Sequence, residues 1–185
     1  MATQSRMLAL GTAAPSFRLM DTASGKPIAL TDFAASRALL IAFICNHCPY
    51  VKHVLDGFVA FAREYRPRGL GVVAISSNDV STHPADSPEE MKKLAGVRNF
   101  AFPYLYDESQ EVARAYDAVC TPDFFLFDAD RRLAYHGEFD GSRPGSAQPV
   151  TGADMRAAAE AVLGGRPAPE KQVPSVGCSI KWKAN

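Results

Sequence analysis

The chain has 185 residues and an apolar fraction of 47%, enough for one compact domain with a buried core that needs no disulfides. Lysine plus arginine number 20, as do aspartate plus glutamate, so the formal net charge is zero. This balance excludes a strongly basic nucleic-acid surface, and no apolar run is long enough to span a bilayer, so we expect neither kind of partner. Gly11 interrupts the short apolar run before it, which predicts no secretory signal and a cytoplasmic location.

The first predicted elements are a hairpin and a buried strand. Residues 17–20 and 28–30 flank the turn sequence D-T-A-S-G-K, which predicts a β-hairpin. Residues 38–45 form the unbroken apolar run A-L-L-I-A-F-I-C. Such a run is typical of a strand with both faces buried, as central parallel strands are.

A long helix is predicted next. Its apolar side chains recur three and four positions apart from Val51 to Tyr65, which indicates one buried stripe. Pro49 suits the first turn, where a missing N–H costs nothing. Pro67 and Gly69 end the helix.

The rest of the chain alternates strands with helices before it becomes a tail. The pattern predicts strands at 71–75, 103–106, 124–127 and 133–136, and helices that begin at Ser87, Asp107 and Gly152. We therefore expect an α/β fold with a mixed central sheet in residues 1–165. Residues 166–185 are predicted to be an extended tail that packs on this domain, because it carries Cys178 and Trp182.

The stretch F-I-C-N-H-C-P-Y-V carries the clearest chemical signal. Cys45 ends the buried strand and Cys48 lies in the first turn of the next helix, so free N–H groups and the positive end of the helix dipole point at Cys45. This position favours a thiolate, because helix N-termini in C-x-x-C motifs lower the cysteine pKa. The sequence predicts a redox pair, with Cys45 nearer solvent as the nucleophile and Cys48, more buried, as the resolving residue. His47 either adds a donor beside the thiolate or is a solvated residue at the helix start.

Taken together, segments along nearly the whole chain resemble the thioredoxin-like superfamily, in its peroxiredoxin-like branch of redoxin (AhpC/TSA-type) proteins. The matching segments are G-T-A-A-P-S-F-R-L-M-D, F-I-C-N-H-C-P-Y-V, F-P-Y-L-Y-D-E-S-Q-E-V-A-R-A-Y, C-T-P-D-F-F-L-F-D, F-D-G-S-R-P-G and P-S-V-G-C-S-I-K-W-K. The resemblance implies a thioredoxin fold with an added N-terminal hairpin. It also implies that Thr121 and Pro122 form a cis-proline turn that faces the cysteine pair and binds an extended substrate by strand addition.

The leading functional hypothesis is a thiol–disulfide oxidoreductase that cycles Cys45 and Cys48. Its expected partners are a protein or small-molecule thiol or disulfide substrate, and a reductant such as thioredoxin or a low-molecular-weight thiol. No cofactor is expected. One departure from thioredoxins is that Leu39 replaces the buried acid that helps move the resolving proton, so this task must pass to another group or to water.

Two other functions remain open on the sequence. A thiol-dependent peroxidase is the first, because Pro49 follows Cys48 as in peroxiredoxins, although Cys45 stands where these proteins have threonine. The second is copper or zinc binding through Cys45, Cys48 and a distant histidine, for which His136 is the best candidate.

Three further residues have a predicted role and a simpler alternative. Cys120 precedes the Thr-Pro turn and Cys178 lies in the tail, so the two are predicted to form a second dithiol, or else each is a small apolar residue. Arg143 either approaches the site and stabilises a thiolate or is a solvated loop residue.

Overall fold

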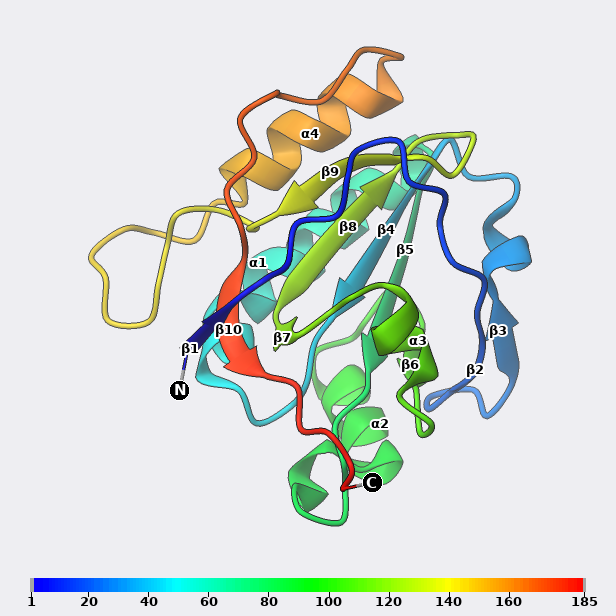
Figure 1. Cartoon of the computed structure of the whole chain (residues 1–185), viewed down its shortest axis with the longest axis vertical. Coiled ribbons are helices and arrows are strands. Elements are labelled where there is room, and N and C mark those ends of the chain that lie inside the picture. Colours follow the sequence, from blue (N-terminus) through cyan, green and yellow to red (C-terminus); the bar gives the residue numbers. More distant parts are fainter. Residues whose placement is uncertain (1, 185) are drawn as a thin grey trace.

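The computed structural model of the protein describes residues 2–184 (Figure 1). Its strands are β1 (Ala2–Gln4), β2 (Arg18–Asp21), β3 (Pro27–Ala29), β4 (Ala38–Phe43), β5 (Leu70–Ser76), β6 (Tyr104–Tyr106), β7 (Cys120–Thr121), β8 (Asp123–Phe127), β9 (Leu133–Gly137) and β10 (Val176–Ser179). The α-helices of this part of the chain are α1 (Pro49–Tyr65), α2 (Pro88–Val97), α3 (Glu111–Ala115) and α4 (Ala153–Leu163). The main sheet has the order β3-β2-β6-β5-β4-β8-β9, and a small second sheet has the order β1-β10-β7.

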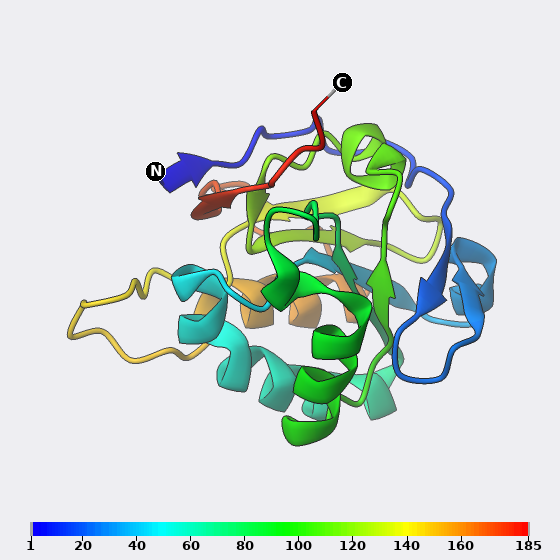
Figure 2. The ribbon, with the colours of Figure 1, turned by 90° about the horizontal axis from the view of Figure 1, so that it is seen from below.

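Strand β4 lies inside the main sheet and leads to the cysteine pair. It pairs in parallel with β5 and antiparallel with β8, so the sheet is mixed, as the sequence predicts. All of β4 is buried, because its alternating side chains enter two cores. Leu40 packs in the core that includes α1 and α4, and Leu39 packs in the core that includes α3. Figure 2 shows α1 and α4 on one face of the sheet and α3 on the other.

The N-terminal hairpin is confirmed. Strands β2 and β3 pair antiparallel with Leu19 opposite Ile28, and β2 also pairs with β6, which attaches the hairpin to the main sheet. The hairpin therefore extends the sheet at an edge far from β8 and β9.

The predicted start is correct for helix α2 but not for helix α3. Ser87 is the N-cap of α2, and its hydroxyl accepts the N–H of Glu90 at 3.4 Å, as the capping pattern predicts. Helix α3, in contrast, begins at Glu111 rather than at Asp107. The Asp107 carboxylate still accepts the N–H of Ala113 at 2.9 Å, but it reaches this first turn from outside the helix.

The tail is more ordered than predicted. Strand β10 pairs antiparallel with β1 on one side and with β7 on the other. The sequence analysis misses β1, because Ala2–Gln4 has no apolar alternation and its partner lies at the other end of the chain. Strands from the first and last parts of the described chain thus pair in the small sheet that includes β7.

No helix within residues 2–184 is long and apolar enough to cross a membrane.

Candidate active site

The cysteine pair lies where β4 leads into α1. Cys48 is the N-cap of α1, and its extended backbone turns the chain from strand to helix. Pro49 follows in the first turn, where its missing N–H leaves no donor unpaired. The N–H of Lys52 donates to the Cys48 carbonyl oxygen at 3.0 Å. The start of α1 is therefore built around Cys48.

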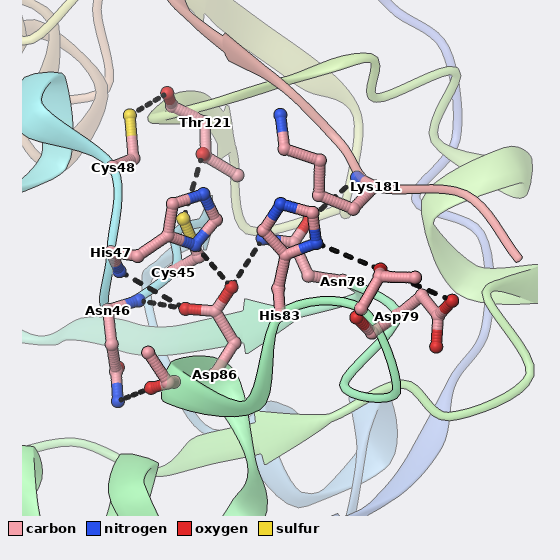
Figure 3. A network of polar contacts seen from close by, with 12 residues as sticks. Cys45, Asn46, His47, Cys48, Asn78, Asp79, His83, Asp86, Thr121 and Lys181 are labelled. Atoms are coloured by element: carbon pink, nitrogen blue, oxygen red, sulfur yellow. Dashed lines mark hydrogen bonds and ion pairs between the residues drawn. The ribbon is translucent and has the colours of Figure 1, made fainter.

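Both sulfurs face Thr121 (Figure 3). The Cys45 Sγ lies 3.2 Å from Thr121 Oγ1, and the Cys48 thiol donates to the Thr121 carbonyl oxygen at 3.2 Å. The peptide bond between Thr121 and Pro122 is cis. The structure thus brings the cysteines, Thr121 and a cis-proline together, as the resemblance implies.

The two sulfurs are equally buried, which the sequence analysis does not predict. It expects Cys45 nearer solvent than Cys48, and this is wrong: the exposed fractions are 1% for Cys45 and 0% for Cys48. The reason is that the Thr121 side chain packs on Cys45 while β10 lies along β7. A substrate therefore reaches the pair only when a covering segment moves.

The charge within the pair is also opposite to the expectation. A hydrogen bond from Cys45 lowers the pKa of Cys48 to about 5, against the effect of burial, and donors from Cys178 and Val51 act in the same direction. That bond, burial and the charge of Asp86 raise the pKa of Cys45. Cys48 is therefore the more acidic thiol of the pair, chiefly because Cys45 stabilises its charged form.

Asp86 is a site residue that the sequence analysis misses. It ends a short 3-10 turn, Pro84–Asp86, and is fully buried. Its Oδ1 accepts the N–H groups of Asn46 at 2.8 Å and His47 at 3.1 Å. Its Oδ2 contacts His47 Nδ1 at 2.5 Å and accepts the Asn78 amide at 2.8 Å (Figure 3). This carboxylate fixes the loop between the cysteines, yet it lies in a polar loop whose sequence carries no signal of the role.

His47 is held in place rather than solvated freely. Its ring contacts Asp86 on one side and lies at a tilt of 31° to the His83 ring, with ring centroids 4.9 Å apart. Ligand atoms of Cys45, His47 and Asp86 lie within 4.8 Å of one another, a set that could hold a metal ion such as zinc. The carboxylate oxygens already accept four hydrogen bonds, however, so a metal would have to displace some of these donors.

His136 does not join this set. It is fully buried, its Nε2 lies 3.0 Å from Asp123 Oδ1, and its Nδ1 accepts the N–H of Leu8 at 3.1 Å. Both ring nitrogens are bonded within the protein. The proposed role of His136 as a distant metal ligand is therefore wrong, because the residue is a structural link between β9, β8 and the N-terminal segment.

The register of β10 separates the other two cysteines. Cys178 lies opposite Thr121, and Ser179 lies opposite Cys120. Successive residues of a strand point to opposite faces, so Cys178 shares the face of Thr121 and the active pair, whereas Cys120 points away from it. Cys178 packs against the core cluster that contains Cys48, and the dithiol between Cys120 and Cys178 stays a prediction. The four cysteines of the described chain are free thiols.

Arg143 lies beside the site, but its guanidinium is bonded to residues near it in the chain. Its guanidinium forms an ion pair with Glu138 and donates to the carbonyl oxygens of Asp140 and Ser142 at 2.8 Å. It lines a small cavity together with Pro122. In the described part of the chain, its hydrogen bonds and its ion pair involve neither sulfur, so a thiolate-stabilising role stays a prediction.

The fold and the cysteine junction together define a thiol protein of the thioredoxin-fold class. One solved neighbour, a thiol:disulfide interchange protein of the thioredoxin family from Chlorobium tepidum, superimposes with a TM-score of 0.65 over 85% of this chain and 99% of its own. Its sequence identity is 20%, so the likeness concerns the fold alone. Within this class, the chain belongs to the AhpC/TSA family, whose family model matches residues 10–136. Members of this family are thiol oxidoreductases and peroxidases.

Two relatives show the range of similarity. The 1-Cys peroxiredoxin B of Oryza sativa subsp. indica is 27% identical over 150 residues, which are 80% of this chain and 61% of the rice protein. An uncharacterized conserved protein from Geobacillus kaustophilus is 54% identical, with a TM-score of 0.98 over 100% of this chain and 98% of its own. The chain thus spans less than two thirds of the rice peroxiredoxin but matches the Geobacillus protein from end to end.

Proposed function

We propose that the protein is a thiol–disulfide oxidoreductase in which Cys45 and Cys48 alternate between a dithiol and a disulfide. The observation that carries the proposal is the convergence of both sulfurs on Thr121 beside the cis-proline. A two-residue spacer at a helix start keeps such sulfurs within bonding reach. The electrons reside in the sulfurs, so the cycle needs no cofactor.

The different acidities of Cys45 and Cys48 determine the order of the steps. The Cys48 thiolate attacks one sulfur of a substrate disulfide, a bond forms between Cys48 and that sulfur, and the other substrate sulfur leaves as a thiolate. Cys45 then loses its proton and attacks Cys48, which releases the substrate as a second thiolate and forms the Cys45–Cys48 disulfide. This order reverses the roles expected from the sequence, because the proton of the reduced pair is held by Cys45.

His47 is placed to receive the proton that Cys45 must lose. Its ring is oriented by Asp86, and the ligand atoms of Cys45, His47 and Asp86 lie within 4.8 Å of one another. One water bridges such a separation. The pair of His47 and Asp86 thus takes over the task of the buried acid that is replaced by Leu39 in this chain.

The substrate is a protein or small-molecule disulfide, and a dithiol such as thioredoxin, or a low-molecular-weight thiol, restores the reduced pair. Exchange with such thiols requires the sulfurs to become exposed during the cycle, because both are buried at rest. A cytoplasmic location remains the expectation from the sequence.

Cysteine variants test the proposal. Cys48→Ser should reduce the rate of disulfide reduction, measured with a chromogenic disulfide and a dithiol reductant, to the rate without protein, and Cys45→Ser should lower it. Cys120→Ser is the matched control and should keep the wild-type rate, because Cys120 points away from the pair. An unchanged rate in both active-pair variants would refute the proposal.

A thiol-dependent peroxidase is a second candidate, favoured by the thiolate at Cys48 and by Pro49 directly after it. The thiolate would attack one peroxide oxygen, form a Cys48 sulfenic acid and release an alcohol or water. The Cys45 thiol would then attack this sulfur, release water and leave the same Cys45–Cys48 disulfide. The rice relative that is named a peroxiredoxin supports this candidate.

The peroxidase reaction has a distinct intermediate. In the double variant Cys45→Ser/Cys178→Ser neither neighbouring thiol can resolve the sulfenic acid, so a dimedone adduct on Cys48 should accumulate after addition of peroxide. Wild-type protein with a dithiol reductant should consume peroxide at a rate that rises with protein concentration. Absence of both signals, together with active disulfide reduction, would leave the first function alone.

A further inference from the structure

Strand β10 covers the edge at which an extended substrate would bind. An antiparallel pairing joins β10 to β7, and the N–H of Ile180 donates to the Val119 carbonyl oxygen at 2.9 Å. An extended peptide that approaches Cys48 along Thr121 needs the same backbone groups of β7. The tail of the chain thus occupies the position of a substrate strand.

The register also brings a sulfur to the position where a substrate sulfur would lie. Cys178 is opposite Thr121, whose carbonyl oxygen is 3.2 Å from the Cys48 Sγ. Cys178 packs against the core cluster that contains Cys48, and it is close enough to lower the pKa of the Cys48 thiol. Cys178 is therefore next to the reactive sulfur of the pair.

Gly177 allows this close approach. A Cβ atom at this residue would lie 1.9 Å from the Thr121 carbonyl oxygen and 2.5 Å from its carbonyl carbon, so only glycine fits against β7 in this register. The strand that carries Cys178 is thus shaped to dock directly on the residue that contacts both active sulfurs.

We propose that Cys178 is a third redox cysteine, which exchanges with the Cys45–Cys48 disulfide and makes the tail strand an internal substrate of the site. The inference rests on the proposed function, because it needs the disulfide that this function forms. Exchange locks the tail covalently over Thr121, and reduction by an external thiol releases it. The site then alternates between a latched form that excludes substrates and a reduced form whose tail can be displaced.

The exchange is balanced without an added oxidant. The Cys178 thiolate attacks the Cys48 sulfur, the Cys48–Cys178 bond forms, the Cys45–Cys48 bond breaks, and Cys45 leaves as a thiolate. Cys178 releases one proton to solvent, which it reaches because it is only partly buried, and Cys45 takes up one proton. Burial and the neighbouring Cys48 raise the pKa of Cys178 to about 11 in the reduced protein, and the second cause disappears once Cys48 is in a disulfide.

Tryptic peptides can distinguish the possible disulfides. Cys45 and Cys48 both lie in the peptide of residues 38–52, Cys120 lies in 115–131, and Cys178 lies in 172–181. A Cys45–Cys48 disulfide is therefore internal to one peptide, whereas a Cys48–Cys178 disulfide joins 38–52 to 172–181. A Cys120–Cys178 disulfide would join 115–131 to 172–181.

The experiment oxidises Cys45→Ser with diamide, which converts two thiols into a disulfide, and maps the peptides by mass spectrometry without reduction. We expect the cross-link between 38–52 and 172–181, with the same yield when Cys120→Ser is added. Cys178→Ser alone should retain the internal disulfide of 38–52 and lose every cross-link to 172–181. Near-ultraviolet circular dichroism checks that each variant is folded before oxidation.

Each outcome has a separate meaning. If folded Cys45→Ser leaves Cys178 free for alkylation, or cross-links 172–181 to 115–131, the inference is overturned while the proposed function stands. If wild-type protein never forms the internal disulfide of 38–52 in a glutathione redox buffer, the proposed function fails. The inference itself is supported when both the internal disulfide of wild-type protein and the cross-link of Cys45→Ser are found.

Discussion

Cys45 and Cys48 are chemically identical side chains in different surroundings. The pKa of Cys48 is lowered chiefly by Cys45 and further by Cys178 and Val51, whereas Cys45 lies near the buried carboxylate of Asp86. The same C-x-x-C spacing could place the charge on either sulfur, so neighbouring groups decide the question. Reactivity in this pair is therefore a property of the residues around it, of which only Val51 is near in sequence.

The first prediction concerns the pH dependence of the reduced pair. A group whose pKa is lowered to about 5 is a thiolate above that pH and a thiol below it, so thiolate ultraviolet absorbance should fall as the pH drops through about 5. Cys48→Ser should abolish this step. Cys45→Ser should move it to higher pH, because the hydrogen bond from Cys45 is the largest cause of the lowered pKa. A step that survives in Cys48→Ser would place the charge on Cys45 instead.

The second prediction concerns the buried carboxylate. Asp86→Asn keeps the shape of the side chain but presents an amide donor to groups that now donate to Asp86, including the N–H of Asn46. The free energy of unfolding should fall by about 1–3 kcal/mol, the cost of leaving a buried donor unpaired. Urea unfolding measures it, with Asp56→Asn as the control. Asp56 is exposed and bonded to Arg98 at the surface, so its change should have almost no effect, and equal losses in both variants would contradict the role of Asp86.

At the scale of elements, β10 is the cover of the site. Gly177→Ala places a methyl group into the Thr121 backbone, so β10 must shift away from β7. We expect a loss of about 1–3 kcal/mol in the free energy of unfolding. We also expect several-fold faster alkylation of Cys48 in the reduced protein, because its sulfur loses its cover. Gly96→Ala is the matched control, since its Cβ atom meets nothing within 4 Å. An unchanged alkylation rate in folded Gly177→Ala would show that β10 does not shield Cys48.

The elements near the site also show which structural features can be predicted from the sequence. The apolar run of β4 and the apolar stripe of α1 are local patterns, so the strand, the helix and the cysteine junction between them follow from neighbouring residues. Strand β1 and the register of β10 depend on partners at opposite ends of the chain. For the same reason the sequence analysis predicts a pair of Cys178 with Cys120, whereas the register of β10 brings Cys178 close to Cys48.

At the scale of the whole molecule, the central sheet separates two cores. Leu40 and Leu39 are both fully buried but enter opposite cores, so β4 anchors the site to each of them. The position of the cysteine pair is therefore tied to the packing of the entire domain, and not only to the loop that carries it.

The last prediction tests this dependence. Leu40→Ala removes a buried side chain from the core that includes α1 and should lower the free energy of unfolding by about 2–5 kcal/mol, measured by chemical denaturation. Val97→Ala is the control, because Val97 is 77% exposed and should change stability little. A loss in Leu40→Ala no larger than that of the control would mean that the core repacks around the gap.

The sequence predicts the two cores better than it predicts the charged network of the site. Apolar periodicity identifies the faces of α1 and β4 directly, because burial follows the geometry of each element. Asp86 and His47 meet only after β5 and the following loop have folded beside β4. No sequence pattern in either segment predicts that contact. The position of Asp86 beside the cysteine pair can therefore be recognised only from the three-dimensional structure.

The covering of β7 by β10 has a consequence for biosynthesis. Synthesis proceeds from the N-terminus, so the ribosome makes Cys45, Cys48 and Thr121 well before the strand that covers them. A nascent chain with the main sheet already assembled therefore presents its reactive sulfurs and an open strand edge to the surrounding thiols. The proposed redox pair is most accessible in the interval before β10 is synthesised, and β10 then covers it.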